Sequence, residues 1–193
     1  MKEIRTAEIR ALAPAADGTE SLIIEGMAIV FDTPTTITDR SGSYTEVIKR
    51  GALDKCDMTD SRLLYNHDLS RVPLARTPKT MEFTVTEHGL QFRATLPDTS
   101  EARSVYESIK RGDITGCSFG FTVSNGNDSY DPDTNTRTIS KIDKLYEISV
   151  TPYPAYPSTS VEARTEQLAS KEHYRALQNL KIMCNKILMK EGK

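Results

Sequence analysis

The sequence predicts a mainly β fold with peripheral helices (α+β), in which the strands form a closed or partly closed β-barrel and the chain ends in a helix. Two observations predict this class. Strand-like runs recur along residues 21–150 and are interrupted by one well-formed helix pattern. Helix patterns are scarce before Asp98, which argues against the alternating order of a doubly wound α/β fold. We expect a barrel domain over residues 1–164 and a helical tail over residues 165–193.

Composition and charge narrow the classes of function. The 193 residues, 37% hydrophobic and 27% charged, are ordinary for one globular domain and too few for a large two-domain enzyme. A formal net charge of -2 gives no overall positive field, so we expect no nucleic-acid partner. The three cysteines have no paired spacing, which favours a reducing compartment and argues against disulfides and structural zinc. We expect no cofactor and no metal.

Targeting signals and repeats are not evident in the sequence. The first residues lack a signal-peptide pattern, and the longest apolar run, around residues 27–31, is far shorter than a membrane span. We therefore expect neither secretion nor membrane insertion. The chain also has no internal repeats and no low-complexity tracts.

The first third of the chain predicts one central strand and a long loop. Residues 21–31 read as the strand, and Gly26 inside it predicts a bulge or a close backbone approach. Residues 32–43 are rich in Thr, Pro, Asp, Ser and Gly and read as a polar loop. Residues 62–68 begin apolar and end polar, which places His67 near the end of a strand.

The clearest local structures are a hairpin and the helix after it. Residues 81–85 and 90–96 alternate apolar and polar side chains across a short turn, the pattern of a β-hairpin. Asp98 and Glu101 have the spacing of a helix N-cap and its reciprocal partner. Apolar residues then recur at helical spacing until Gly112, which predicts the end of the helix.

The last third predicts further strands and a terminal helix. Residues 119–124 read as a strand, residues 125–136 as a polar loop and residues 137–150 as one or two strands. The tail carries a short apolar stripe of heptad-like spacing made by Leu177, Leu180, Cys184 and Ile187. Such a helix either packs on its own domain or contacts a second copy or a partner.

Ser118 stands between Gly116 and Gly120, just after the predicted helix and just before the predicted strand. Glycines on both sides permit the sharp backbone geometry that exposes a serine hydroxyl to a substrate. The same pattern occurs in α/β-hydrolases, but there a strand precedes the serine and a helix follows it. The order here is reversed, which excludes that fold. An ordinary turn serine is the alternative interpretation.

A nucleophilic serine needs a base, and imidazole suits that task because it titrates near neutral pH. His88 falls in the hairpin turn and His173 on the tail helix, so only His67 ends an apolar strand where packing can hold its ring. A structural histidine is the alternative. Cys117 is not favoured as the nucleophile, because in a strand its side chain faces away from that of Ser118.

A third group has to orient the imidazole. Glu147 interrupts residues 145–150, a strand otherwise suited to burial, and a buried carboxylate requires a partner. An outward-facing glutamate on a one-sided sheet is the alternative. Asp68 is a weaker candidate, because neighbouring strand residues point to opposite faces.

Several short motifs follow one another in a characteristic order. They are residues 25–28 (EGMA), 50–53 (RGAL), 66–68 (NHD), 73–76 (PLAR), 112–121 (GDITGCSFGF), 146–149 (YEIS) and 154–156 (PAY). The ordered set resembles the prohead (capsid maturation) serine proteases of tailed phages, which are distantly similar to the herpesvirus assembly proteases. The resemblance covers about residues 23–164. Ala75 stands where members of the family often have glycine.

The resemblance implies a β-barrel serine endopeptidase, similar to the herpesvirus assembly proteases, packaged inside the immature capsid in the host cytoplasm. It implies that capsid and scaffold proteins are the substrates and partners, and that the enzyme often cleaves itself. The family's histidine, serine and acidic residue fall on His67, Ser118 and Glu147. Backbone N–H groups near Ser118, or an arginine such as Arg164, would then stabilise the oxyanion. A non-catalytic capsid assembly or scaffold-binding factor is the competing interpretation, and an esterase is a second one.

Overall fold

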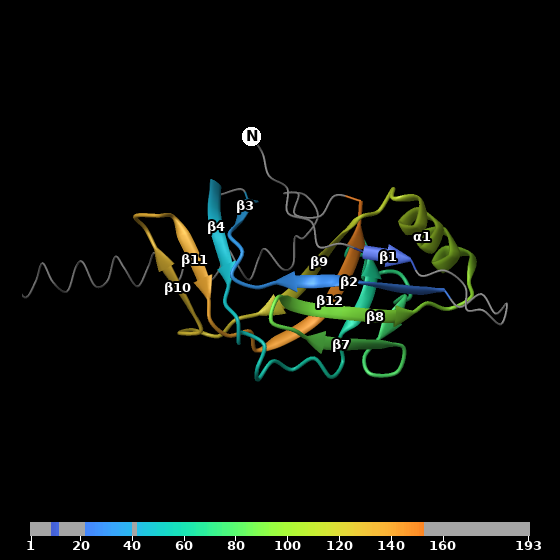
Figure 1. The fold of residues 1–193 in the computed structure, drawn as a ribbon, viewed down its shortest axis with the longest axis horizontal. Helices are drawn as coiled ribbons and strands as arrows, with labels where there is room; N and C mark the ends of the chain where they lie inside the picture. Colours follow the sequence, from blue (N-terminus) through green and yellow to red (C-terminus); the bar gives the residue numbers. More distant parts are fainter. Residues whose placement is uncertain (1–8, 12–21, 40–41, 153–193) are drawn as a thin grey trace, which may run out of the picture.

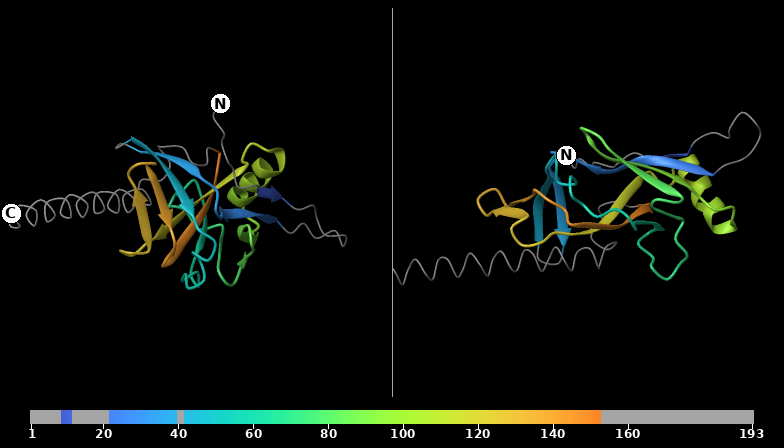
Figure 2. Two further views of the ribbon diagram at one scale, coloured as in Figure 1. Left: turned by 60° about the vertical axis from the view of Figure 1, so that its left-hand side comes forward. Right: turned by 90° about the horizontal axis from the view of Figure 1, so that it is seen from below.

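The computed structural model describes residues 9–11, 22–39 and 42–152, which form twelve strands and one helix (Figure 1). The strands make three four-stranded sheets, which we call sheets A, B and C. Figures 1 and 2 show sheet B at one end of the molecule and the helix at the other, with sheets A and C between them. One cluster of buried apolar side chains joins the three sheets and the helix.

Sheet A contains the predicted hairpin. Its strand order is β1 (Ile9–Ala11), β2 (Ile23–Val30), β8 (Gly89–Thr95) and β7 (Met81–Val85). The antiparallel β7–β8 pair confirms the hairpin, and β2 lies inside the sheet as expected. Gly89 has a φ of 156°, and a Cβ there would lie 1.9 Å from the carbonyl oxygen of Ile29. The hairpin therefore needs glycine at this position. The bulge in β2 lies between Met27 and Ile29 and not at Gly26.

Sheet B corrects two loop predictions. Its order is β10 (Asp128–Asp131), β11 (Thr136–Ile139), β4 (Gly42–Ile48) and β3 (Thr35–Asp39). The polar segments 32–43 and 125–136 thus contain strands, because their threonines suit a pleated backbone and their neighbours satisfy its hydrogen bonds.

A buried ion cluster joins three strands of sheet B. Nη1 of Arg137 lies 2.9 Å from Oε2 of Glu46, and Nε of Arg137 lies 2.7 Å from Oδ2 of Asp128. All three side chains are at most 6% exposed. Burial is the largest influence on the carboxyl of Glu46 and raises its pKa, although the charge of Arg137 opposes this effect.

Sheet C carries the candidate catalytic residues. Its order is β6 (Ala75–Arg76), β5 (Arg62–Tyr65), β12 (Lys144–Thr151) and β9 (Gly116–Thr122). β12 runs parallel to β5 and antiparallel to β9. Ala75 is buried opposite Leu63 and is not among the residues with positive φ, so alanine fits this position.

The single described helix, α1 (Ser100–Arg111), follows sheet A in sequence. Its N-cap is Thr99, whose hydroxyl accepts a hydrogen bond from the backbone N–H of Ala102, so the prediction of Asp98 was one residue early. Gly112, in the left-handed conformation, ends the helix as predicted. Within the described ranges, no helix combines the length and apolar character that a membrane span requires.

The predicted barrel is wrong for the described residues. Each sheet has two edge strands and none closes on itself. β2 of sheet A and β9 of sheet C lie in contact but do not pair. A closed barrel would need backbone hydrogen bonds between them, whereas here only packed side chains join the two sheets. The mainly β, α+β class is confirmed. The predicted C-terminal helix, its apolar stripe and the domain boundary at residue 164 lie outside the described residues.

Candidate active site

His67 follows β5 in a turn with an uncommon backbone conformation. Asn66 and His67 have φ angles of 53° and 58°, in the left-handed region. The backbone N–H of Asn66 donates to the carbonyl oxygen of Val150 at 3.0 Å, and that of His67 donates to Oγ of Ser149 at 3.1 Å. β12 therefore holds the turn from the side, and the turn brings the imidazole back to β12.

Glu147 lies in β12 immediately after a bulge. Leu145 pairs with Phe121 and Glu147 pairs with Gly120, so Tyr146 has no partner on β9. Successive residues of β9 point to opposite faces, and Leu145 and Glu147 consequently face opposite sides of sheet C although they are two residues apart. The side chain of Glu147 is only 12% exposed, which contradicts the alternative of an outward-facing glutamate.

The imidazole of His67 and the carboxylate of Glu147 are in direct contact. Nδ1 of His67 lies 2.8 Å from Oε1 of Glu147, and Oε2 of Glu147 accepts a hydrogen bond from Oγ of Ser149 at 2.6 Å. Nε2 of His67 is buried and has no hydrogen-bond partner in the described part of the chain. An imidazole whose Nδ1 is held by a carboxylate and whose Nε2 has no partner is suited to act as a general base.

Ser118 lies on the neighbouring strand. It is the third residue of β9, so the prediction that it precedes the strand is wrong: pairing with β12 extends the strand back to Gly116. Ser118 is directly opposite Ser149, and opposite residues share a face with Cβ atoms about 4.5–5.5 Å apart. The hydroxyl of Ser118 makes no hydrogen bond within the described residues, to His67 or to any other group. The structure thus joins His67 to Glu147 and places Ser118 one strand away on the face of Glu147.

Gly120 makes room for the carboxylate. It pairs with Glu147, and a Cβ at position 120 would lie 2.8 Å from Oε1 of Glu147, closer than such contacts allow. Glycine at this position is therefore a requirement of the Glu147 side chain, in addition to being part of the pattern around Ser118.

The other titratable candidates do not join this group. Burial raises the pKa of the Cys117 thiol, which keeps it protonated, and its place in β9 directs it to the face opposite Ser118. Asp68 bonds to Ser70 and Arg71, and the hydrogen bond from the Ser70 hydroxyl is the main cause of its lowered pKa. His88 is exposed beside a neighbouring glutamate, and His173 and Arg164 lie outside the described residues. Among the residues described, no group of three or more His, Cys, Asp or Glu side chains is arranged to hold a metal ion.

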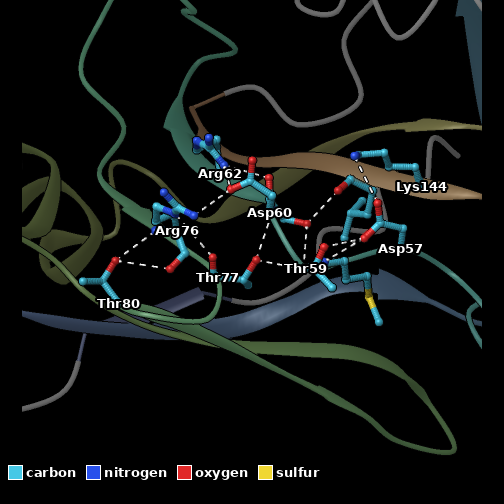
Figure 3. Close-up of polar contacts among 11 residues, drawn as sticks. Asp57, Thr59, Asp60, Arg62, Arg76, Thr77, Thr80 and Lys144 are labelled. Atoms are coloured by element: carbon cyan, nitrogen blue, oxygen red, sulfur yellow. Dashed lines mark hydrogen bonds and ion pairs between the residues drawn. The ribbon is translucent and has the colours of Figure 1, made fainter.

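A polar network surrounds the starts of β5 and β12 in sheet C (Figure 3). Asp60 binds both Arg62 and Arg76, which stand opposite each other on β5 and β6. Lys144, the first residue of β12, pairs with Asp57 at 3.0 Å. The network thus ties together the starts of the strands that lead to His67 and Glu147, and it gives Arg76 of the PLAR motif a supporting role.

A groove of about 380 Å³ adjoins the segment after His67. Arg71 bridges this segment to α1 by ion pairs with Asp68 at 3.0 Å and with Glu101 at 3.1 Å. The groove is lined by Tyr65, Arg71, Ser100, Glu101, Ser104, Val105, Ser108 and Ile114. His67, Ser118 and Glu147 are not among its lining residues.

Sequence reasoning missed Ser149. The signal for it was present, because Glu147, Ser149 and Thr151 alternate with apolar residues over the segment 146–151. Ser149 and Thr151 are fully buried, and both of their hydroxyls bond to the turn that carries His67. A row of buried polar side chains in one strand needs partners, and here the partners belong to the candidate site.

One comparison with known proteins identifies a family. A family model described as caudovirus prohead serine protease matches residues 6–174, most of the chain. No curated protein and no solved structure shows significant similarity. The matched range includes the strands and the turn that carry Ser118, Glu147 and His67. The chain belongs to the caudovirus prohead serine protease family.

Proposed function

We propose that this chain is a serine endopeptidase that processes the scaffold, or the scaffolding segment of the capsid protein, and also itself during phage head maturation. It would act inside the immature capsid in the host cytoplasm, where proteases of this family are expected. The observation that supports the proposal most strongly is the His67–Glu147 pair with its buried, unpartnered Nε2. Ser118, on the strand next to Glu147, is the nucleophile in this proposal.

Acylation begins when a scissile peptide carbonyl lies beside Ser118. Nε2 of His67 accepts the hydroxyl proton as Oγ of Ser118 forms a bond to the carbonyl carbon. The tetrahedral intermediate collapses, the C–N bond breaks, and the proton on Nε2 passes to the leaving amine. Glu147 holds Nδ1 and stabilises the imidazolium that exists between the two proton transfers.

Deacylation repeats the sequence with water. Nε2 of His67 accepts a proton from a water molecule as its oxygen attacks the ester carbonyl of the acyl-enzyme. The ester C–O bond then breaks, the proton returns to Oγ of Ser118, and the new carboxyl terminus leaves. Ser118 and His67 are regenerated, so one water is consumed for each peptide bond cleaved.

Labelling of the purified full chain with a fluorophosphonate tests this proposal, because an activated serine attacks the phosphorus of the probe, displaces fluoride and is left as a phosphonate ester. Intact mass and peptide mapping should find one adduct, on Ser118, in the wild type. Ser118→Ala should take up none, and His67→Ala should react far more slowly. Cys117→Ala changes the neighbouring residue and is the matched control, which should label like the wild type.

The competing functions give different results in the same assay. A non-catalytic assembly or scaffold-binding factor would take up no probe. An esterase would be labelled at Ser118 but would leave capsid and scaffold proteins intact on co-expression. An adduct that forms equally well in Ser118→Ala would contradict the assignment of the nucleophile.

A further inference from the structure

We infer that Ser149 is a positioning residue of the proposed protease: its hydroxyl fixes the carboxylate of Glu147 and the backbone of His67 at the same time. The inference rests on the proposed function. Ser149 would not touch the substrate, and it would act through the two residues that it holds.

The hydrogen bonds of Ser149 define this role. Its Oγ donates to Oε2 of Glu147 at 2.6 Å and accepts the backbone N–H of His67 at 3.1 Å. A hydroxyl has one hydrogen to donate, so these two bonds use its donor and one acceptor position. The single oxygen atom therefore sets both the rotation of the carboxylate and the distance of the histidine backbone from β12.

The backbone at His67 needs such support. Two consecutive residues, Asn66 and His67, hold left-handed φ angles, which are unfavourable for side chains with a Cβ. β12 contacts both residues: Thr151 donates its hydroxyl to Oδ1 of Asn66 at 3.2 Å, and Ser149 accepts the N–H of His67. Without the oxygen of Ser149, the backbone N–H of His67 would lose its hydrogen-bond partner. The imidazole would then no longer be held in position against the carboxylate of Glu147.

The carboxylate needs the same support. Oε1 of Glu147 holds Nδ1 of His67, and the missing Cβ of Gly120 leaves space next to that oxygen. Ser149 occupies the other oxygen, which prevents the carboxylate from turning away from the imidazole. Both side chains of the pair are only 12% exposed, so water has little access to replace the Ser149 hydroxyl.

The position of Ser149 also distinguishes it from a second nucleophile. Ser149 and Ser118 stand opposite each other on β12 and β9. Ser149 is fully buried and its proton is donated to Glu147, whereas Ser118 is half-buried and its hydroxyl has no partner in the described ranges. The two facing serines therefore have different tasks: Ser118 reacts and Ser149 positions the base.

The matched control is Thr77. Its buried hydroxyl has the same bonding pattern, since it donates to the carbonyl oxygen of Met58 at 2.8 Å and accepts the backbone N–H of Ser61 at 2.9 Å. Thr77 belongs to the polar network at the starts of β5 and β12 (Figure 3), and its hydroxyl bonds to Ser61 and Met58 rather than to His67 or Glu147. Thr77→Val thus removes a comparable pair of hydrogen bonds without touching His67 or Glu147.

The kinetic test measures the rate of phosphonylation of the full chain by a fluorophosphonate in the wild type and four variants: Ser149→Ala, Glu147→Gln, the double variant and Thr77→Val. The fraction of protein labelled at completion gives the fraction of molecules with a folded site. The rate constant of labelling measures how well His67 is positioned in those molecules. Ser149→Ala should lower the rate constant about 10- to 100-fold with the labelled fraction unchanged. In the Glu147→Gln background the same change should cost clearly less than in the wild type, because the support that Ser149 gives to the carboxylate is already lost and only its support of the His67 backbone remains. An equal loss in both backgrounds, or a rate constant like that of Thr77→Val, would overturn the inference.

A second readout does not depend on catalysis. The proton on Nδ1 of His67, bonded to Glu147, should give a low-field proton NMR signal that His67→Ala removes. Ser149→Ala should shift or broaden this signal, and Ser118→Ala and Thr77→Val should leave it in place. An unchanged signal in Ser149→Ala refutes the positioning role. If the wild type shows the signal but takes up no fluorophosphonate, the proposed function has failed while the positioning geometry stands.

Discussion

Gly120 of β9 lies directly opposite Glu147 of β12, and a Cβ atom at position 120 would approach Oε1 of that carboxylate to 2.8 Å. The same oxygen lies 2.8 Å from Nδ1 of His67. The second glycine beside Ser118 therefore has its clearest structural effect on the strand opposite. It lets the carboxylate lie flat against β9, where it meets the imidazole.

Gly120→Ala should therefore impair catalysis more than stability. The added methyl group displaces Oε1 of Glu147 by a few tenths of an ångström or more, and misplacement of a catalytic group by about 1 Å can cost on the order of 100-fold in rate. The measurement is the rate constant of scaffold cleavage per labelled site. Gly126→Ala is the control: Gly126 has a φ of 88° and open space around it, so alanine there strains the backbone away from the site. Wild-type cleavage by Gly120→Ala would contradict the role given to this glycine.

Glu147→Gln should lower kcat by about 10^3- to 10^4-fold and leave KM nearly unchanged. The amide keeps the shape of the side chain but loses the negative charge that stabilises the imidazolium of His67. It can also present N–H groups to Nδ1, which favours the wrong tautomer. Peptide hydrolysis measured over a range of substrate concentrations separates the two constants. Glu82→Gln, at an exposed position of β7, controls for the loss of a carboxylate, and a kcat for Glu147→Gln within tenfold of wild type would remove Glu147 from the mechanism.

The buried cluster in sheet B predicts a pH dependence of stability. Burial raises the pKa of Glu46 above its ordinary value of 4.5, so in the folded chain Glu46 binds a proton more tightly than in the unfolded chain. Its contribution to stability is therefore complete below pH 4.5 and is lost as the pH rises through the folded pKa.

Glu46→Gln should remove this dependence. The amide has no charge to bury and can still accept a hydrogen bond from Arg137, which retains its ion pair with Asp128. Urea unfolding between pH 4.5 and pH 8 should show the wild type losing stability relative to Glu46→Gln, by about 1.4 kcal/mol for each unit by which the pKa is raised. A difference between the two proteins that does not change with pH would contradict the raised pKa.

Local signals in the sequence predicted the local structures. Alternation along residues 81–96 identified the hairpin, and helical spacing before Gly112 identified α1 and its end. These features depend on neighbours in the chain. Segments 32–43 and 125–136 were misjudged because their polar composition resembles that of loops. Their strands pair locally, β3 with β4 and β10 with β11. The long-range part is the parallel pairing of β11 with β4 across about 90 residues, which joins the two hairpins into one sheet.

In the candidate site, too, the residues could be predicted from the sequence, but the long-range pairing that positions them could not. Chemistry and motif order selected His67, Ser118 and Glu147, and the contact between His67 and Glu147 is present in the structure. The bulge at Tyr146 that turns Glu147 toward the histidine could not be predicted, since it depends on the register with β9. The task of Ser149 depends on two left-handed residues in a turn that sequence reasoning treated as the end of a strand.

The most direct test of the account is co-expression of the full chain with its capsid and scaffold proteins, read by intact mass. The wild type should convert the scaffold, or the scaffolding segment of the capsid protein, to defined fragments and should shorten itself. Ser118→Ala should leave all three proteins at full length, while Cys117→Ala should process them as the wild type does. Complete processing by Ser118→Ala would contradict the central claim that Ser118 is the nucleophile of a prohead protease.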